Sequence, residues 1–130
     1  MSVTVGMKGR AEDTVNKRNT ALEAGSGTLP VFATPWMCAL MEKAAWTAIS
    51  PALSAGESTV GTKLNISHLS ASPVGIKVWA ECEVTAVDGK RIELSVAAYD
   101  ESGLIGKGTH ERFIVENDRF LAKAARKLEG

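Results

Sequence analysis

The stretch TPWMCALMEKAAWTAISPAL, residues 34–53, decides the fold of this chain. Thr34 can cap a helix, and Pro35 fits the first helical position, where no amide hydrogen is needed. At 100° per residue the apolar side chains gather on one broad face, which consists of Met37, Cys38, Met41, Ala44, Ala45, Ala48 and Ile49. Pro51 is expected to end or disrupt the helix. The stretch therefore predicts one long helix with a buried side.

The residues before this helix carry weaker signals. The alternation Val3-Thr4-Val5 favours a strand near the N-terminus. Residues 24–30 read AGSGTLP, and this density of turn-forming residues predicts a loop that leads into the helix. This part of the chain is therefore expected to supply one strand and one loop.

The residues after the helix predict four strands. Apolar residues alternate in four segments, which are residues 60–70, 74–87, 92–98 and 105–115. Asp88-Gly89 and Glu101-Ser102-Gly103 separate the later segments and are typical of tight turns. Asn117 can cap a final helix, whose apolar face would hold Phe120, Leu121, Ala124 and Leu128. The second half of the chain is thus predicted to be mostly sheet.

The order of these elements indicates the fold class. One weakly marked strand is followed by a long helix and then by strands that hairpins mostly join. Segregated elements of this kind are typical of an α+β fold with an antiparallel sheet of about five strands. The 130 residues suit one domain, residues 1–130, which is large enough to bury a core. Because one helix covers only one face of a sheet, dimerisation is one way to protect the other face or an edge.

Composition narrows the classes of partner. Fifteen basic and fifteen acidic residues cancel, so no basic field is present to hold a nucleic acid or an anionic membrane. No apolar run approaches the roughly 20 residues of a membrane span, and residues 1–10 do not resemble a secretory leader. Cys38 and Cys82 lack metal-like spacing and are expected to be free thiols. We therefore expect a cytoplasmic protein without a metal site or a cofactor.

Three polar residues stand where they could share a reaction. Thr34 begins the predicted helix, and Glu42 lies two turns further on, about 80° around the helix. Glu42 is therefore at the margin of the apolar face, where partial removal from water makes a carboxylate a better base. His68 is in phase with Leu64 and Ile66, so its imidazole is expected to point inward. The ordinary pKa of histidine, about 6.5, suits proton transfer near neutral pH.

Each of these residues also has a purely structural interpretation. Thr34 can serve as a helix cap, Glu42 as a boundary residue that reaches water, and His68 as a core histidine with satisfied hydrogen bonds. Both interpretations of Thr34 can hold together, because free amides at a helix N-terminus also bind a developing oxyanion. His110, next to Glu111, is a lesser candidate and is expected on the surface of its strand.

Four segments together resemble one known family. They are residues 31–35, VFATP; residues 41–45, MEKAA; residues 60–69, VGTKLNISHL; and residues 72–75, SPVG. In sequence and spacing they resemble the fluoroacetyl-CoA thioesterase-like family of hotdog proteins, over most of the chain as far as about Val115. The spacing of Thr34, Glu42 and His68 is similar to the Thr/Glu/His catalytic set of that family.

The resemblance implies a fold, an activity and a set of site residues. The fold is the hotdog, a long helix wrapped by a curved antiparallel sheet and commonly paired into a homodimer. The activity is hydrolysis of an acyl-CoA thioester, with Thr34, Glu42 and His68 as catalytic residues. Gly61 falls where the family brings backbone close to the thioester carbonyl, and Pro35 is expected to line the same substrate site. Arg112 is expected to contact the phosphates of CoA.

Several alternatives remain open at this point. Glu42 can attack the carbonyl and form a transient anhydride, or it can orient a water molecule. A hotdog hydratase or dehydratase is the rival enzyme, although no Asp lies near the helix start to act on the acyl chain. A non-catalytic module that binds acyl-CoA is the rival of another class. The acyl group, and whether two dimers pair into a tetramer, are not predicted.

Overall fold

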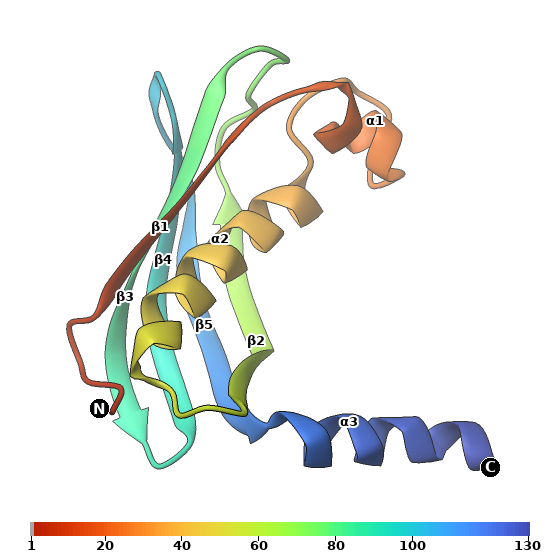
Figure 1. Cartoon of the computed structure of the whole chain (residues 1–130). Coiled ribbons are helices and arrows are strands. Elements are labelled where there is room, and N and C mark those ends of the chain that lie inside the picture. Colours follow the sequence, from red (N-terminus) through yellow and green to blue (C-terminus); the bar gives the residue numbers. More distant parts are fainter. Residues whose placement is uncertain (1) are drawn as a thin grey trace.

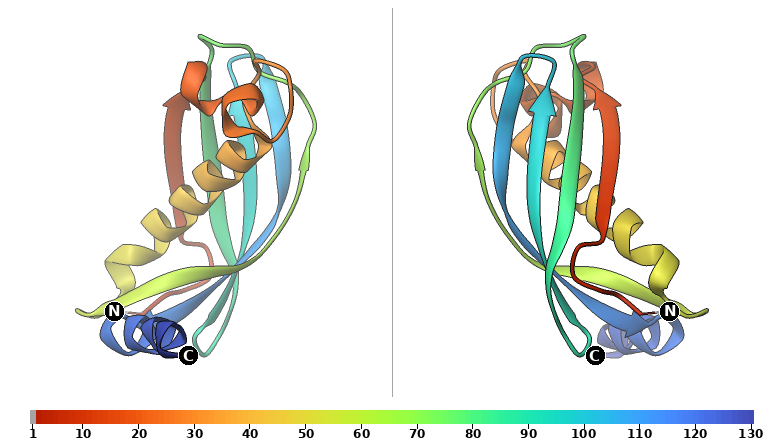
Figure 2. Two further views of the ribbon diagram at one scale, coloured as in Figure 1. Left: turned by 90° about the vertical axis from the view of Figure 1, so that its right-hand side faces the viewer. Right: turned by 90° about the vertical axis from the view of Figure 1, so that its left-hand side faces the viewer.

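The computed structural model describes residues 2–130, which form a curled antiparallel sheet around one long helix (Figure 1). The sheet contains five strands in the order β1-β3-β4-β5-β2. The bounds of the strands are Lys8–Thr14 (β1), Glu57–His68 (β2), Lys77–Asp88 (β3), Arg91–Asp100 (β4) and Gly103–Glu116 (β5). Helix α2, Thr34–Ile49, crosses the concave side of the sheet (Figure 2). The predicted α+β class is confirmed.

The core lies between α2 and the sheet. The residues of α2 that are buried are Met37, Leu40, Met41, Ala44, Ala45 and Ile49. They pack against inward-facing residues of the strands, among them Val78, Val84, Ile92, Leu94 and Ile105. At Gly9, β1 packs directly against the backbone of α2, because a Cβ atom there would collide with the carbonyl oxygen of Ala44. The predicted apolar face of the helix is therefore its buried side, with Leu40 added and with Cys38 and Ala48 only partly buried.

Two boundaries differ from the sequence-based expectation. The first strand is not at Val3–Val5 but at Lys8–Thr14, because Gly6, with φ of 97°, turns the chain before the ladder with β3 begins at Lys8. Val3 is nevertheless buried in the core. The long helix ends at Ile49 rather than Leu53, since Pro51 sits in a 3₁₀ turn, Ser50–Ala52, where it leaves no helical hydrogen bond broken.

Short helices connect and extend these elements. They are η1 (Lys17–Asn19), α1 (Ala21–Ala24), η2 (Ser50–Ala52), α3 (Asn117–Ala125) and η3 (Arg126–Glu129). Helix α3 leaves the end of β5 and projects away from the sheet (Figure 1). Asn117 is the first residue of α3 and not its cap, because Glu116 occupies the cap position. The amide of Asn117 donates to the carbonyl of Gly56 at 2.9 Å. No helix within residues 2–130 is long and apolar enough to cross a membrane.

Strand β2 forms one edge of the sheet and contains an irregularity. It pairs only with β5, so its other side offers unpaired backbone groups. The register shifts between Gly61 and Lys63, where Thr62 is the extra residue of a β-bulge. Gly61 faces Arg112 across the ladder, and Leu64 faces His110. The bulge thus lies beside the polar residues that the sequence placed in the last strand.

Candidate functional site

The first half of the site lies at the N-terminus of α2. The Thr34 Oγ1 atom is 2.7 Å from Nδ1 of His68, which ends β2. The expectation that Thr34 caps the helix is wrong, because Ala33 occupies the cap position and no side chain caps the helix. The hydroxyl is therefore free to meet the imidazole, and the first amides of α2 keep no helical partner. The hydroxyl of Thr34, the imidazole of His68 and the free amides at the start of α2 therefore form one polar cluster.

His68 is placed for proton transfer. Burial lowers the pKa of its imidazole, and the Ser70 backbone opposes that shift only in part. The ring is therefore neutral at neutral pH and can accept a proton. Its Nε2 atom is shielded from solvent and has no hydrogen-bond partner within residues 2–130. Such an orphaned atom is expected where a substrate or a second chain completes a site.

A pocket opens beside this pair of residues. It has a volume of about 310 Å³ and is lined by Thr34, His68 and the segments around them, which are Ala21, Ser26, Val31, Phe32, Leu69, Ser70 and Ala71. Pro35, exposed at the same end of α2, lies next to Thr34 in the chain. The pocket gives a small ligand access to the Thr34 hydroxyl.

The second half of the site lies two turns further along α2. The Oε2 atom of Glu42 is 3.8 Å from NH1 of Arg112, and the Glu42 side chain is 42% exposed while that of Arg112 is 7% exposed. Gly61 makes room for the carboxylate, because a Cβ atom there would lie 2.6 Å from Oε2 of Glu42. Glu42 is therefore a partly desolvated carboxylate that is paired with a buried cation and still reaches solvent.

Arg112 is engaged inside the fold. Its Nε atom donates to Oγ1 of Thr59 at 2.8 Å, and its NH2 atom donates to the carbonyl oxygen of the same residue at 2.9 Å. Burial lowers the pKa of the guanidinium, and Glu42 opposes that shift. In this position the group faces Glu42 rather than solvent, so nothing in the geometry supports the expected contact with CoA phosphates.

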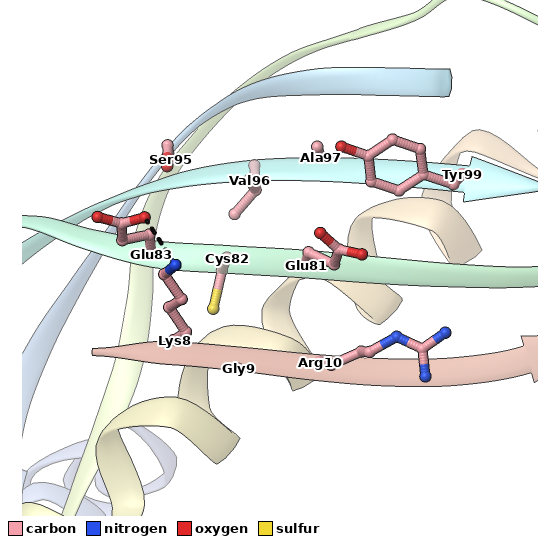
Figure 3. Close-up of a pocket in the computed structure, with 10 residues that line it drawn as sticks. All are labelled: Lys8, Gly9, Arg10, Glu81, Cys82, Glu83, Ser95, Val96, Ala97 and Tyr99. Carbon is pink, nitrogen blue, oxygen red and sulfur yellow. Dashed lines mark ion pairs between the residues drawn. The ribbon is translucent and has the colours of Figure 1, made fainter. Parts of the chain in front are cut away.

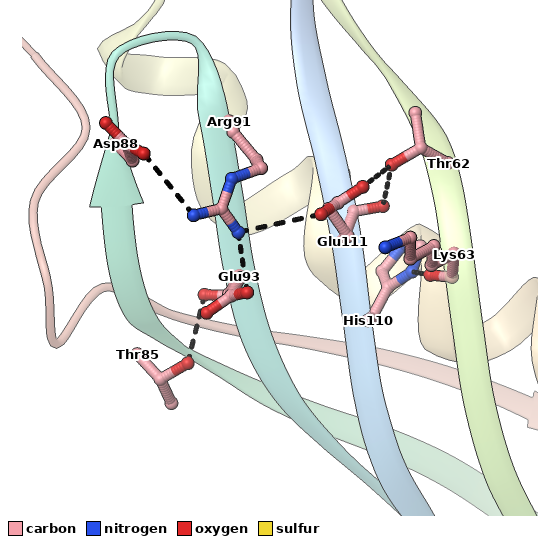
Figure 4. A network of polar contacts seen from close by, with 8 residues as sticks. All are labelled: Thr62, Lys63, Thr85, Asp88, Arg91, Glu93, His110 and Glu111. Carbon is pink, nitrogen blue, oxygen red and sulfur yellow. Dashed lines mark hydrogen bonds and ion pairs between the residues drawn. The ribbon is translucent and has the colours of Figure 1, made fainter.

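His110 is the polar residue that sequence reasoning misplaced. It was expected on the strand surface, but it is only 3% exposed. Its Nδ1 atom is 2.7 Å from the carbonyl oxygen of Lys63 (Figure 4), and its Nε2 atom is 3.2 Å from NH1 of Arg112. The alternation of side chains along a strand could have predicted that His110 is buried. His110 and Arg112 share one face of β5, and His110 pairs with Leu64.

The two halves of the site are separated within one chain. Thr34 and Glu42 are eight residues apart on α2, which corresponds to about 12 Å along the helix axis. Cys38 lies between them at the same helical spacing. Burial raises the pKa of its thiol, and the charge of Glu42 adds to that shift, so the thiol stays protonated. The three residues that the sequence selected therefore do not meet in a single chain.

A larger hollow lies elsewhere. It measures about 570 Å³ and is a groove on the side of β1, β3 and β4 that faces away from α2 (Figure 3). Lys8 and Glu83 pair across it at 4.0 Å, with Arg10, Glu81 and Tyr99 along it. None of the reactive residues lines this groove, so we place the site at the smaller pocket. The described residues contain no group of three or more potential metal ligands.

Comparisons with known proteins bear on this arrangement. Residues 15–118 match the family described as fluoroacetyl-CoA-specific thioesterase. The fluoroacetyl-CoA thioesterase of Streptantibioticus cattleyicolor is 40% identical over 97 residues, which cover 75% of this chain and 70% of that protein.

Solved structures show the same arrangement of elements. A variant of the fluoroacetyl-CoA-specific thioesterase in complex with fluoroacetate and CoA aligns with a TM-score of 0.85 and 32% identity, over 91% of this chain and 99% of that chain. A thioesterase superfamily member from Thermus thermophilus aligns with a TM-score of 0.90 and 31% identity, over 98% and 94% of the two chains. The expected hotdog fold is confirmed by these likenesses.

Proposed function

The chain belongs to the family of fluoroacetyl-CoA-specific thioesterases, and on this premise we propose that it hydrolyses an acyl-CoA thioester to the free acid and CoA through Thr34, Glu42 and His68. The observation that carries the proposal is the 2.7 Å contact between the Thr34 hydroxyl and the His68 imidazole at the start of α2. A hydroxyl, a neutral imidazole and free amides at one pocket are suited to acyl transfer.

Thr34 and the start of α2 receive the thioester carbonyl. The hydroxyl of Thr34 and the unpaired amides of the first helical turn donate hydrogen bonds to the carbonyl oxygen. These donors stabilise the negative charge that grows on that oxygen when the carbonyl carbon is attacked. The loss of one such donor typically costs about 3 to 4 kcal/mol of transition-state stabilisation.

Glu42 and His68 handle the nucleophile and the protons. The Glu42 carboxylate either attacks the carbonyl carbon to form an anhydride or orients the water that attacks it. In both routes the bond between carbon and sulfur breaks, and the thiolate of CoA takes up a proton. His68, neutral because burial lowers the pKa of its ring, accepts the proton that water releases and returns it to the sulfur.

The two routes differ in where oxygen from water appears. In a single turnover in ¹⁸O-labelled water, the route with activated water puts the label in the acid product and none in the protein. Only the anhydride route can place the label in the Glu42 carboxylate in that single turnover, which happens when water cleaves the anhydride at the Glu42 carbonyl and the acid leaves unlabelled. Mass spectrometry of the peptide that contains Glu42 separates the two routes.

The separation between the two halves of the site supports a homodimer. About 12 Å divides Thr34 from Glu42 within one chain, which is too far for both to act on one carbonyl. Strand β2 has a free edge, and His68 ends that strand while Gly61, which makes room for Glu42, lies near its middle. Antiparallel pairing of two such edges would bring the His68 end of one chain toward the Gly61 region of its partner. We propose that each site takes Thr34 and His68 from one protomer and Glu42 from the other.

Complementation tests this arrangement. The variants His68→Ala and Glu42→Gln, each inactive alone, are co-expressed so that mixed dimers form. Every mixed dimer then contains one intact site, and random pairing restores about a quarter of wild-type activity. If all three residues of a site came from one chain, the mixture would stay as inactive as its components.

The acyl group and the compartment are the finer parts of the proposal. Release of free CoA from a panel of short-chain, long-chain, aryl and fluorinated acyl-CoA substrates, detected with a thiol reagent, identifies the preferred acyl group. We propose a cytoplasmic location, in keeping with two free thiols at Cys38 and Cys82 and with an acyl-CoA substrate.

A further inference from the structure

We propose that helix α3 of each protomer docks on the other protomer, where its apolar face covers the rim of the pocket at Thr34 and His68. The inference rests on the proposed function, because it uses the antiparallel pairing of two β2 edges. It assigns a role to a helix that supplies no residue to the proposed reaction.

Helix α3 extends beyond the β2 edge of its own chain. Glu116, which ends β5, pairs with Glu57, which begins β2. The next residue, Asn117, is fixed by its backbone hydrogen bond to Gly56. From this anchor α3 runs outward on the side of the sheet where β2 lies, in both views of the molecule (Figure 1, Figure 2). The helix therefore enters the space that a chain paired along β2 would occupy.

The side chains of α3 are divided between two faces. At 100° per residue, its apolar face holds Phe120, Leu121 and Ala124, and Leu128 of η3 continues this face. None of the residues of α3 is buried, and Leu121 and Leu128 are 63% and 92% exposed. The opposite face is basic and holds Arg119, Lys123, Arg126 and Lys127. Neighbouring apolar side chains that are this exposed indicate a surface that another molecule covers.

A second group of exposed apolar side chains surrounds the pocket at the start of α2. Leu22 of α1 and Leu29 of the following loop are joined by a backbone hydrogen bond of 3.1 Å. Leu69 follows His68 and lines the pocket itself. All three leucines are more than half exposed. An apolar element that covered them would remove this surface from water, which is favourable.

The proposed dimer brings these two surfaces together. Helix α3 starts beside the first residue of β2, and the pocket lies beside the last residue of that strand, His68. A two-fold axis between antiparallel β2 edges places the start of one strand next to the end of the other. Each α3 is therefore directed at α1 and the pocket of the partner, and the two contacts are equivalent, as a closed dimer requires.

Charge is consistent with this occupant. Helices α3 and η3 contain more basic than acidic residues, whereas Glu23 is the only charged residue in the segment 20–33 that carries α1 and the loop. A basic amphipathic helix can also bind an anionic membrane. The partner protomer is the occupant that we infer, because a membrane on α3 would leave the equally exposed Leu22 and Leu29 uncovered.

Cross-linking between differently tagged chains tests the contact. Leu121→Cys and Leu22→Cys are placed in separate chains, each with Cys38→Ala, and the purified mixed dimers are treated with a short bismaleimide. We expect a covalent dimer in this mixture and none in either variant alone, because the two-fold axis keeps equivalent residues at opposite ends. Val5→Cys mixed with Leu22→Cys is the control, since Val5 is as exposed as Leu121 but precedes β1, at the opposite edge of the sheet. Absence of the covalent dimer, or an equal yield with Val5→Cys, would overturn the docking.

The kinetic consequence is weaker binding of the acyl-CoA. Leu121→Asp places a charge on the apolar face of α3 and should release the helix from the partner. We expect KM to rise on the order of tenfold while kcat stays within about twofold, because Thr34, Glu42 and His68 are unchanged. Val5→Asp, at matched exposure, should leave both constants unchanged. A wild-type KM in Leu121→Asp, or the same rise in Val5→Asp, would contradict the proposal.

Three results separate this inference from its alternatives. If His68→Ala and Glu42→Gln complement each other but the cross-link does not form, the dimer of the proposed function stands and the docking of α3 is overturned. The cross-link needs no turnover, so its formation in a protein that cleaves no acyl-CoA would support the docking while the proposed function fails. Sedimentation of the wild type with phosphatidylserine vesicles, abolished by Leu121→Asp and without a cross-link, would overturn the docking and assign α3 to a membrane surface.

Discussion

The two halves of the site are built in opposite ways. At the start of α2, Thr34 and His68 bond to each other, line an open pocket, and leave Nε2 of the imidazole without a partner among residues 2–130. Near the middle of α2, Glu42 pairs with the buried side chain of Arg112. Arg112 in turn forms hydrogen bonds with Thr59 and His110. The half at the start of α2 thus lacks a hydrogen-bond partner, whereas the carboxylate in the other half is paired with a buried cation.

This difference indicates that the half at the start of α2 is the one completed by a ligand or a second chain. A buried polar atom without a partner is costly, so it persists where a ligand or a second chain supplies the missing bond. A carboxylate with a buried cation behind it is held in place before the substrate arrives, which avoids reorganisation during the reaction. We therefore expect changes in the middle of the helix to affect the chemical step, and changes at its start to affect proton transfer and oxyanion binding.

The largest effect is expected for Glu42→Gln. The amide keeps the shape of the side chain but can neither attack the carbonyl nor activate water, so kcat should fall by about 10²- to 10⁴-fold. Thioester cleavage is measured with purified protein through release of free CoA. Turnover close to that of the wild type would show that Glu42 is only a boundary residue of α2.

A similar but smaller loss is expected for His68→Ala. Without the imidazole, proton transfer to and from water is lost, and turnover should fall by about a hundredfold or more while the protein stays folded. Circular dichroism is the control for folding. His68→Ala with unchanged thioester cleavage would remove the start of α2 from the proton-transfer steps and leave Thr34 as an oxyanion donor alone.

Gly61→Ala tests the space in front of Glu42. The added Cβ atom would lie 2.6 Å from Oε2 of Glu42, 3.2 Å from His110 and 3.3 Å from NH1 of Arg112. The carboxylate must therefore shift, and we expect kcat to fall on the order of tenfold or more. Asn65→Ala, an exposed position on the same strand, is the matched control. Identical rates for the two variants would mean that the position of the carboxylate is not critical.

The smallest effect concerns stability at low pH. The pKa of His110 is lowered mainly by burial and also by Arg112, while the Lys63 carbonyl and Glu42 oppose the shift. The unfolded chain therefore binds this proton at a higher pH than the folded chain does. Stability is fully present above a pH of about 6.5 and falls as the pH drops below it, by at most about 1.4 kcal/mol per pH unit for one proton.

Urea unfolding at several pH values measures this dependence. The midpoint for the wild type should decrease between about pH 7 and about pH 5, and His110→Gln should show a weaker decrease because it removes one of the titrating groups. His68, whose pKa is also lowered by burial, is expected to contribute to the remaining dependence. The prediction is wrong if both proteins depend on pH to the same degree.

Much of the fold could be predicted because its signals are local. The periodicity of residues 34–53 predicted α2, and alternating residues predicted β2 to β5 with small errors at their ends. The first strand was misplaced, because Lys8–Thr14 is largely polar and gains its partner only when β3 is folded beside it. The cap at Thr34 was also wrong, since a hydroxyl at a helix start serves either the helix or a distant side chain, and only the folded chain brings His68 within reach.

The sequence by itself determined the α+β class and the long helix, and it selected Thr34, Glu42 and His68 as the candidate site residues. The tertiary structure alone decided which side chains meet. It paired Thr34 with His68, set Glu42 about 12 Å further along the helix, and buried His110 and Arg112 behind it. The physical reason is that helix and strand periods are encoded by neighbouring residues, whereas the bulge at Thr62, the gap at Gly61 and the contacts between β2, β5 and α2 arise only when distant segments pack together.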